Sequence, residues 1–411
     1  MKMSQEAKKT KLYSSRVVYV CDLLLFKECD KIPNICGRAI LVHNLIRAYD
    51  LLSHMHLIPS EPASEDILLS FHSRNYIEFL QKVEESSDLE NHEEDLLEFG
   101  LAYDCPLVEG IYKFVQSIAG ASITCAQVLV DGLARIAINW CGGWHHAQRD
   151  EAEGFCYVND IVLAIHKLRE KFSRILYIDF DLHHGNGVEN AFSFSPHVMT
   201  LSLHKYEPGF YPGSGGLSDV GLGQGRYYTV NVPLKEGVRD DNYFTIFQSI
   251  ANKVWSTFCP NAVVVQCGAD CINGDPACGF NLTPRGIGRC IENVLAWNVP
   301  TLFLGGGGYN LPNTARCWTY LTSIILGLQI TSSIPDSNLD FMCYSPDFEL
   351  DIVRGNRSDL NTAEDMKHLT ETICSATTVS AQISLSSGHL AQMALIDIFW
   401  QLRYEICIIN R

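Results

Sequence analysis

Four short apolar runs, each followed at once by polar or glycine-rich residues, constrain the fold of this chain more than any other feature. The runs span residues 136–140, 175–178, 262–267 and 300–304. Runs of this length that are rich in Val, Ile and Leu are typical of strands buried on both faces of a parallel sheet. Helical patterns lie between them at residues 160–171, 241–258 and 284–296. The alternation predicts an α/β fold, a single large domain with a mostly parallel central sheet flanked by helices.

The balance of charges excludes one large class of function. The chain has 411 residues, with 31 Lys and Arg against 47 Asp and Glu, which gives a formal net charge of −16. A protein that grips nucleic acid needs a basic surface for the phosphates, so we expect no direct nucleic-acid binding. Hydrophobic residues make up 47% of the chain and charged residues 19%, which leaves enough apolar material for a large core.

The chain lacks the patterns of a secreted or membrane-spanning protein. Residues 1–11 are polar and carry several Lys, and no uncharged apolar stretch reaches the roughly 18 residues that cross a bilayer. We therefore expect no membrane association and a location in the nucleus and cytoplasm. Sixteen cysteines are present without any Cys-x-x-Cys pair, so reduced and mostly buried thiols are predicted.

The polar residues after the second and third runs have the pattern of a metal site. Asp181 and His183 are two positions apart, so in an extended chain their side chains point to the same side. Asp270 follows the third run, and in folds of this class ligands bind where the carboxyl ends of the strands meet. Two carboxylates and one imidazole with an open position predict a catalytic metal ion. Zinc is the default, although the mixed oxygen and nitrogen set also suits iron(II).

Gly185 bears on the number of metal ions. A binuclear hydrolase of the arginase type has a further carboxylate two residues after the histidine, in an Asp-x-His-x-Asp motif. This chain has Gly185 at that position instead. One metal ion per chain is therefore favoured.

Two further loops follow the first and fourth runs. His145 and His146 come after a glycine pair in one loop, and tandem histidines at this edge of the sheet suit general acid and base catalysis. Asp179, at the end of the second run, is a candidate to orient one of them. In the other loop, the four glycines at residues 305–308 let the backbone pass close to a ligand and present the phenol of Tyr309 to a developing oxyanion. No Gly-Lys-Ser/Thr follows these glycines, which argues against a phosphate-binding loop.

Longer motifs around these residues resemble those of the zinc-dependent class I histone deacetylases. The motifs are WCGGWHHA at residues 140–147, GFCY at 154–157, DFDLHHG at 179–185 and GGGGYN at 305–310. The resemblance extends from residue 18 to residue 378. It implies the arginase/deacetylase fold and the removal of acetyl groups from lysine side chains. It also divides the chain into a polar N-terminal segment at residues 1–14, a catalytic domain at 15–378 and a divergent tail at 379–411.

The resemblance implies a role for each residue of the reaction centre. The zinc ligands would be Asp181, His183 and Asp270, which agrees with their spacing. His146 would act as the general base and then as the acid. His145 would be its electrostatic neighbour, paired with Asp179, and Tyr309 would donate a hydrogen bond to the oxyanion.

The resemblance implies substrate and potassium sites as well. Phe155 and Tyr211 would wall a tunnel for the apolar stem of lysine, Gly154 would accept its amide proton, and Asp104 would hold the substrate backbone at the rim. Structural potassium ions would occupy two sites in this family. The first would comprise Asp179, Asp181, His183, Ser202 and Leu203, and the second Phe192, Ser195, Val198 and Tyr228.

The chain departs from the family's usual pattern at several positions. Asn186 stands where class I members have Asp, Tyr211 where many have Phe, and Ala277 where they have Met or Leu. Asn186 would contact His146, and a neutral amide stabilises an imidazolium less than a carboxylate does. Ala277 removes bulk beside the tunnel, which predicts a wider mouth. Arg38 would line an exit for acetate, next to a loop that differs from the family.

Two alternatives to a protein deacetylase are open. An acetylpolyamine amidohydrolase would use the same chemistry on a small cation. A catalytically silent chromatin-binding scaffold would be expected to lack a metal ligand, His146 or Tyr309, and all of these are present. The favoured interpretation is a metal-dependent deacetylase of lysines in histone tails or other proteins, which regulates chromatin and represses transcription beside chromatin-associated partners. The acidic net charge suits a Lys-rich substrate.

Overall fold

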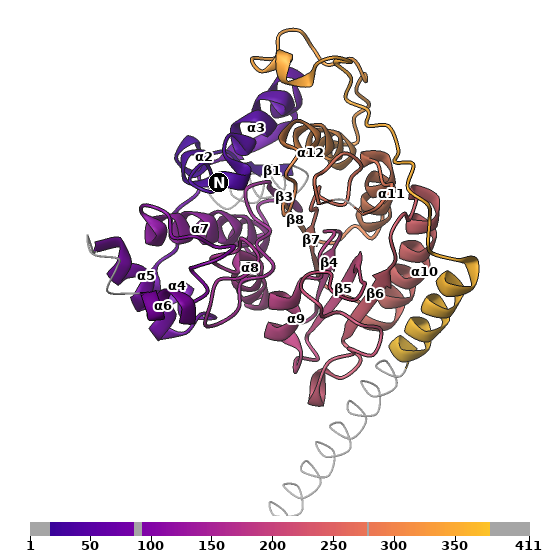
Figure 1. Ribbon diagram of the computed structural model, residues 1–411, viewed down its shortest axis with the longest axis horizontal. Coiled ribbons are helices and arrows are strands. Elements are labelled where there is room, and N and C mark those ends of the chain that lie inside the picture. Colours follow the sequence, from indigo (N-terminus) through magenta and orange to yellow (C-terminus); the bar gives the residue numbers. More distant parts are fainter. Residues whose placement is uncertain (1–16, 86–92, 278, 379–411) are drawn as a thin grey trace, which may run out of the picture.

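The computed structural model describes residues 17–85, 93–277 and 279–378 (Figure 1). The N-terminal segment predicted at residues 1–14 and the tail predicted at residues 379–411 lie outside the described residues. The division of the chain at those boundaries therefore stays a prediction. Within the described part, strands and helices alternate along the sequence and form a single α/β domain.

One sheet of eight strands runs through the domain, with the strand order β2-β1-β3-β8-β7-β4-β5-β6. The strands are β1 (Val17–Val20), β2 (Met55–Ile58), β3 (Ile136–Asn139), β4 (Ile175–Asp179), β5 (Val198–Lys205), β6 (Thr229–Leu234), β7 (Ala262–Gln266) and β8 (Thr301–Leu304). Every neighbouring pair is parallel. The prediction of a mostly parallel sheet is confirmed, and the four predicted strands are the four contiguous central ones, β3, β8, β7 and β4.

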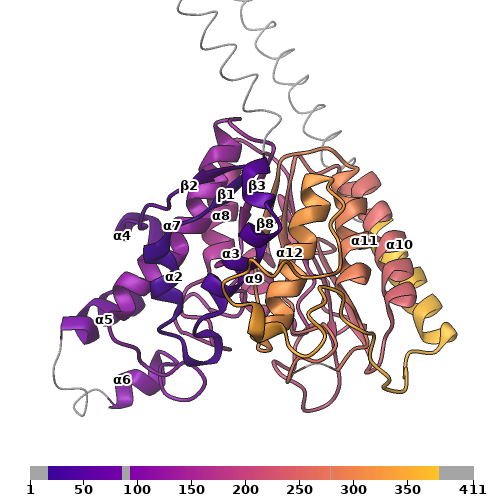
Figure 2. The same cartoon turned by 90° about the horizontal axis from the view of Figure 1, so that it is seen from above.

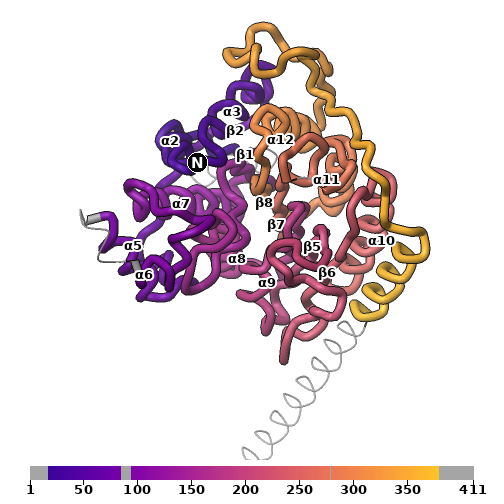
Figure 3. Tube along the Cα trace, viewed as in Figure 1, coloured from indigo at the N-terminus to yellow at the C-terminus, as the bar shows by residue number. Residues whose placement is uncertain are grey.

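Helices cover both faces of the sheet, as Figure 2 shows. They are α2 (Leu23–Cys29), α3 (Arg38–Ala48), α4 (Glu65–Leu68), α5 (Arg74–Glu85), α6 (Glu93–Glu98), α7 (Ile111–Val130), α8 (Asp160–Arg169), α9 (Asn186–Phe192), α10 (Asp240–Phe258), α11 (Pro284–Leu295) and α12 (Leu311–Leu326). The three predicted helices are α8, α10 and α11, and their bounds lie within two residues of the prediction. A last helical segment at residues 363–378 lies beside α10 (Figure 3).

Alternate residues of each central strand build two separate cores. In β4, Leu176 and Ile178 pack in a core with α10, α11 and α12, whereas Ile175 and Tyr177 pack in a core with α7 and α8. All four side chains are buried. A strand that is covered on both faces needs apolar residues at every position, which is why these runs stand out in the sequence.

The long helix α7 belongs to the second of these cores. By length and composition it is able to cross a membrane, but 61% of its apolar window is buried inside the protein, and it packs against α8 and β3. The predicted thiol state agrees with the structure, because the described cysteines are all free and most of them are buried.

The difference between a buried and an exposed position predicts that two leucine substitutions differ clearly in their effect on stability. Leu176→Ala removes a side chain with no exposed surface from β4, which should destabilise the protein by about 2–5 kcal/mol because it leaves a cavity. Leu339→Ala makes the same change where the side chain is 73% exposed, and should change stability by less than about 0.5 kcal/mol. Thermal melting of both variants checks this; equal melting temperatures would contradict the assignment of Leu176 to the core.

Candidate active site

Three predicted metal ligands come together at the carboxyl edge of the sheet. Asp181 and His183 follow β4, and Asp270 follows β7, the neighbouring strand. One ligand atom from each lies within 4.8 Å of the others. Nδ1 of His183 is 2.9 Å from Oδ2 of Asp270 and 3.3 Å from Oδ1 of Asp181. Both carboxylates are buried, while His183 is partly exposed.

The charges of this cluster indicate that it fits a cation. Burial and the neighbouring Asp181 carboxylate raise the pKa of Asp270 to about 7. Burial opposes a charge on His183, but hydrogen bonds to Asp181 and Asp270 raise the pKa of His183 to about 10. Without a metal ion, the two carboxylates therefore hold an extra proton on the imidazole. A divalent cation supplies the same positive charge and can use all three side chains as ligands, so the donor set fits a metal ion.

Hydrogen bonds from neighbouring loops fix the two carboxylates. Oδ2 of Asp181 accepts from Nε2 of Gln266 at 2.7 Å and from the backbone N–H of Gly307 at 2.9 Å. Oδ1 of Asp270 accepts from the backbone N–H of Leu182 at 2.9 Å. Each of these bonds joins the ends of two different strands, so the ligands are held in place by the packing of the sheet itself.

The tandem histidines lie beside the three predicted metal ligands, with Nε2 of His145 3.8 Å from Oδ1 of Asp181. Nδ1 of His145 is 2.8 Å from Oδ2 of Asp179, which also accepts from the Tyr177 hydroxyl at 2.6 Å. Burial disfavours a charged imidazole, but the Asp179 and Asp181 carboxylates raise the pKa of His145 to about 9. The Nε2 atoms of His145 and His146 are 3.0 Å apart. His145 is therefore positively charged near neutral pH and faces its neighbour.

The neighbouring imidazole of His146 is neutral. Burial and the positive charges of His145 and His183 hold the pKa of His146 well below its usual range. Its Nδ1 donates to Oδ1 of Asn186 at 2.8 Å, which leaves the lone pair on Nε2. Nε2 of His146 faces the Nε2–H of His145 at 3.0 Å, and a neutral imidazole with its lone pair on Nε2 is able to accept a proton.

A buried carboxylate that the sequence analysis did not single out holds the histidine loop, the segment at residues 140–147 that carries His145 and His146. Asp160, at the start of α8, accepts from the backbone N–H groups of Gly143 and Trp144 at 3.0 and 2.8 Å. Gly143 has a φ of +100°, and a Cβ there would lie 2.5 Å from the carbonyl oxygen of Gly305. The two glycine-rich loops thus pack backbone against backbone, which explains the need for glycine at this position.

The glycine-rich loop after β8 presents Tyr309. The backbone N–H groups of Tyr309 and Asn310 donate to Oδ2 of Asp275 at 2.6 and 3.0 Å. Arg38 donates from Nη1 to the carbonyl oxygens of Gly306 and Gly308, at 3.0 Å each. Burial and the nearby carboxylates raise the pKa of Tyr309, so its phenol stays protonated as a hydrogen-bond donor.

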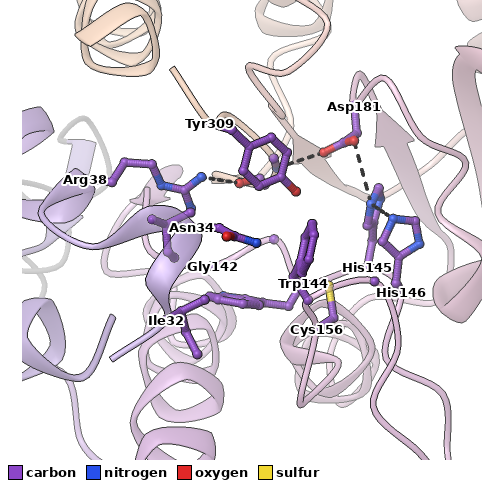
Figure 4. A pocket seen from close by; sticks show the side chains of 16 residues that line it. Ile32, Asn34, Arg38, Gly142, Trp144, His145, His146, Cys156, Asp181 and Tyr309 are labelled. Carbon is purple, nitrogen blue, oxygen red and sulfur yellow. Dashed lines mark hydrogen bonds and ion pairs between the residues drawn. The ribbon is translucent and has the colours of Figure 1, made fainter. Parts of the chain in front are cut away.

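A pocket lies next to these groups (Figure 4). Its lining includes Ile32, Asn34, Ile35, Arg38, Gly142, Gly143, Trp144, His145, His146, Gly154, Phe155, Cys156, Asp181, Gly306, Gly307 and Tyr309. The rings of Phe155 and Tyr309 meet edge to face with centroids 5.7 Å apart. Arg38 therefore lines the cavity and holds the glycine-rich loop at once.

The residues predicted at the rim lie around Gly154. Its backbone N–H donates to Oδ2 of the exposed Asp104 at 2.9 Å. Gly154 has a φ of +56°, and a Cβ there would lie 2.5 Å from both the His146 ring and the Tyr211 hydroxyl. Tyr211 is 38% exposed, and its ring meets that of His146 edge to face with centroids 5.0 Å apart. The structure thus brings the predicted substrate residues Asp104, Gly154 and Tyr211 close to His146, the predicted base.

Ala277 and the residues of the first predicted potassium site lie close to the same sheet edge. The residues of the second predicted potassium site lie near the start of β5. Ala277 is partly buried, and its N–H donates to Oδ1 of Asp275 at 2.9 Å. In the first predicted site, Asp179 of β4 pairs with Ser202 of β5. Asp181 and His183 follow Asp179 along the chain, and Leu203 follows Ser202 within β5. Phe192, Ser195, Val198 and Tyr228 surround the start of β5. Potassium binding at either place stays a prediction.

Sequence reasoning missed several residues that shape the site. They are Glu153, Asp160, Phe210, Gln266 and Asp275. The ring of Phe210 stacks on that of His183 with centroids 5.2 Å apart. Gln266 and Asp275 lie at or after the end of a predicted strand and were within reach of the strand-end argument, whereas Glu153 and Asp160 act through contacts between distant segments.

Comparison with known proteins agrees with the geometry. Residues 33–325, more than half of the chain, match the family model of the histone deacetylase domain. The chain is 50% identical to histone deacetylase 8 of Xenopus tropicalis over 382 residues, which cover 93% of this chain and 97% of the relative. It is 51% identical to histone deacetylase 8 of Danio rerio over 357 residues, 87% and 94% of the two chains. Identity to histone deacetylase 1 of Homo sapiens is 42% over 329 residues, 80% and 68% of the two chains.

The cluster of Asp181, His183 and Asp270 predicts stoichiometric metal binding. We expect the purified protein to hold one divalent metal ion per chain and Asp270→Ala to lose most of it, because the substitution removes a ligand and part of the negative charge that attracts the cation. Elemental analysis by mass spectrometry measures the metal content. Asp104→Ala makes the same substitution at an exposed rim position and should keep the metal; full metal content in Asp270→Ala would contradict the assignment.

Proposed function

The chain belongs to the histone deacetylase family, and we propose that Asp181, His183 and Asp270 form the zinc centre of its active site. The protein is a lysine deacetylase, a hydrolase that acts in chromatin regulation. One observation carries the assignment of the site. Asp181, His146 and Tyr309 line a single cavity, so a metal ligand, a neutral imidazole and a protonated phenol face the same space.

Each side chain in this site has a step in the proposed mechanism. When bound, zinc supplies a Lewis acid and lowers the pKa of water. His146 accepts a proton from the attacking water at Nε2 and later returns it to the leaving lysine amine. Asn186 keeps the other proton of His146 on Nδ1. His145, held by Asp179, stabilises negative charge that develops nearby, and Tyr309 donates a hydrogen bond to the oxyanion of the acetyl group.

The proposed substrate is an acetylated lysine of a histone tail or of another protein. Phe155 and Tyr211 would flank its side chain, and burial of each methylene contributes about 0.8 kcal/mol. Gly154 would accept the amide proton, and Asp104 would hold the backbone of the peptide. The exposed position of Asp104 next to Gly154 supports this role, because a carboxylate at the mouth suits a Lys-rich peptide.

Several further parts of the proposal rest on the family. A nuclear role is expected of a histone deacetylase, and we propose a cytoplasmic pool as well. Chromatin-associated proteins would be partners, and potassium would bind near β4 and β5. Residues 15–378 would be the catalytic domain, between a polar segment at 1–14 and a divergent tail at 379–411.

Deacetylation of an acetyl-lysine peptide tests the proposed function. We expect the native protein to release acetate and to stop when a chelator removes the metal. Tyr309→Phe should lower kcat by about 100-fold or more, because it deletes an oxyanion donor. Activity on acetylpolyamines but not on peptides would contradict the proposed substrate, and inactivity on both would favour a silent scaffold.

The small side chain at position 277 predicts a broad choice of acyl group. Ala277 lies on the same turn as Asp275, which anchors the backbone of Tyr309. Ala277→Met should lower the ratio of the rate on longer acyl-lysines to the rate on acetyl-lysine, compared with the native chain. The reason is that the added bulk narrows the mouth of the tunnel. Ala363→Met, an identical change at an exposed residue away from the site, is the control. An unchanged ratio of acyl to acetyl rates in Ala277→Met would refute the idea.

A further inference from the structure

The general base of the proposed mechanism contacts an amide rather than a carboxylate. Nδ1 of His146 is 2.8 Å from Oδ1 of Asn186. An amide oxygen carries no net charge, so by itself it stabilises a protonated imidazole less than a carboxylate does. A full negative charge is therefore missing from the position next to Nδ1.

A negative charge is present on the other side of the Asn186 amide, on the carboxylate of Glu153. Nδ2 of Asn186 donates to Oε1 and Oε2 of Glu153 at 2.9 and 3.1 Å. Gln148 donates to Oε2 at 2.6 Å, and the Tyr211 hydroxyl donates to Oε1 at 2.9 Å. Three side-chain donors from three segments thus converge on one partly buried carboxylate. A merely solvated loop residue would not collect such a set.

Glu153 also fixes the orientation of the Asn186 amide. A carboxylate only accepts hydrogen bonds, so the NH2 group of Asn186 has to face Glu153 and its oxygen has to face His146. That oxygen keeps a proton on Nδ1 of His146 and leaves the lone pair on Nε2. The reversed amide would set its oxygen against the carboxylate and an N–H against the Nδ1 proton.

We propose that Glu153 is the carboxylate partner of the base in this chain, a positioning residue that acts on His146 through Asn186. The inference rests on the proposed role of His146 as the general base. No proton passes along the chain of groups: Asn186 keeps both of its amide protons. Glu153 polarises the amide and supplies the negative charge that stabilises the imidazolium after His146 accepts a proton, in a partly buried network where hydrogen bonds reinforce one another.

This role accounts for two departures from the family at once. Asn186 and Tyr211 both donate to Glu153. An Asp at position 186 would place a second carboxylate at hydrogen-bond distance from Glu153, and a Phe at position 211 would remove one donor. The three residues therefore form a matched set in which the carboxylate has moved from position 186 to position 153.

Exchange of the charge between positions 153 and 186 tests the proposal. The kcat and KM for an acetyl-lysine peptide are measured for the native chain, Glu153→Gln, Asn186→Asp and the double variant. Glu153→Gln removes the charge, and Asn186→Asp sets two carboxylates against each other, so each should lower kcat by about 10-fold or more with little change in KM. The double variant places one carboxylate directly on His146 and should regain most of the native kcat.

Controls separate this inference from misfolding and from the proposed function. Glu151→Gln changes an exposed carboxylate of the same loop and should keep the native kcat. Metal content and melting temperature identify a variant that does not fold. A native kcat in Glu153→Gln, or a double variant as slow as the product of both single effects, would overturn the inference. If Glu153→Gln does not fold, Asn186→Asp still decides, because a kcat equal to or above native would overturn it. Failure of the native chain to deacetylate would instead overturn the proposed function.

Discussion

Burial of three carboxylates at one edge of the sheet governs the rest of this protein. Asp179, Asp181 and Asp270 are at most 1% exposed, and isolated charges in such surroundings are strongly destabilising. The imidazoles of His145 and His183 offset part of this negative charge, and backbone and side-chain donors satisfy the oxygens. The remaining imbalance is what makes the site suited to a divalent metal ion.

The parallel sheet supplies the geometry that this arrangement needs. The four central strands β3, β8, β7 and β4 all end at one edge, so the histidine loop, the glycine-rich loop and the metal ligands meet although they are far apart in sequence. Hydrogen bonds then tie each loop to its neighbours: Gly307 to Asp181, and Arg38 to the carbonyls of the glycine-rich loop. The same contacts thus hold the packing of the sheet edge and shape the proposed active site.

The sequence predicts the four central strands and the three metal-ligand candidates better than the outer strands and the residues that surround the site. The central strands are apolar at nearly every position because both faces are covered, whereas the edge strand β2 is only partly buried, β5 carries Thr200, Ser202 and His204 among its apolar residues, and β6 contains Pro233. The convergence of Asp181, His183 and Asp270 follows from their spacing and from the strand ends. By contrast, the contacts that Glu153 makes with Asn186 and Tyr211 span 33 and 58 residues. No local pattern encodes such contacts, so Glu153 could be found only in three dimensions.

Anomalous diffraction from crystals of the native, active protein tests the central claim most directly. Data collected on either side of the zinc absorption edge locate the metal without reference to activity. The account predicts one peak at about 2.0–2.2 Å from Nδ1 of His183 and from a carboxylate oxygen of each of Asp181 and Asp270. A metal peak bound elsewhere, or an active crystal form with no metal at these three residues, would contradict it.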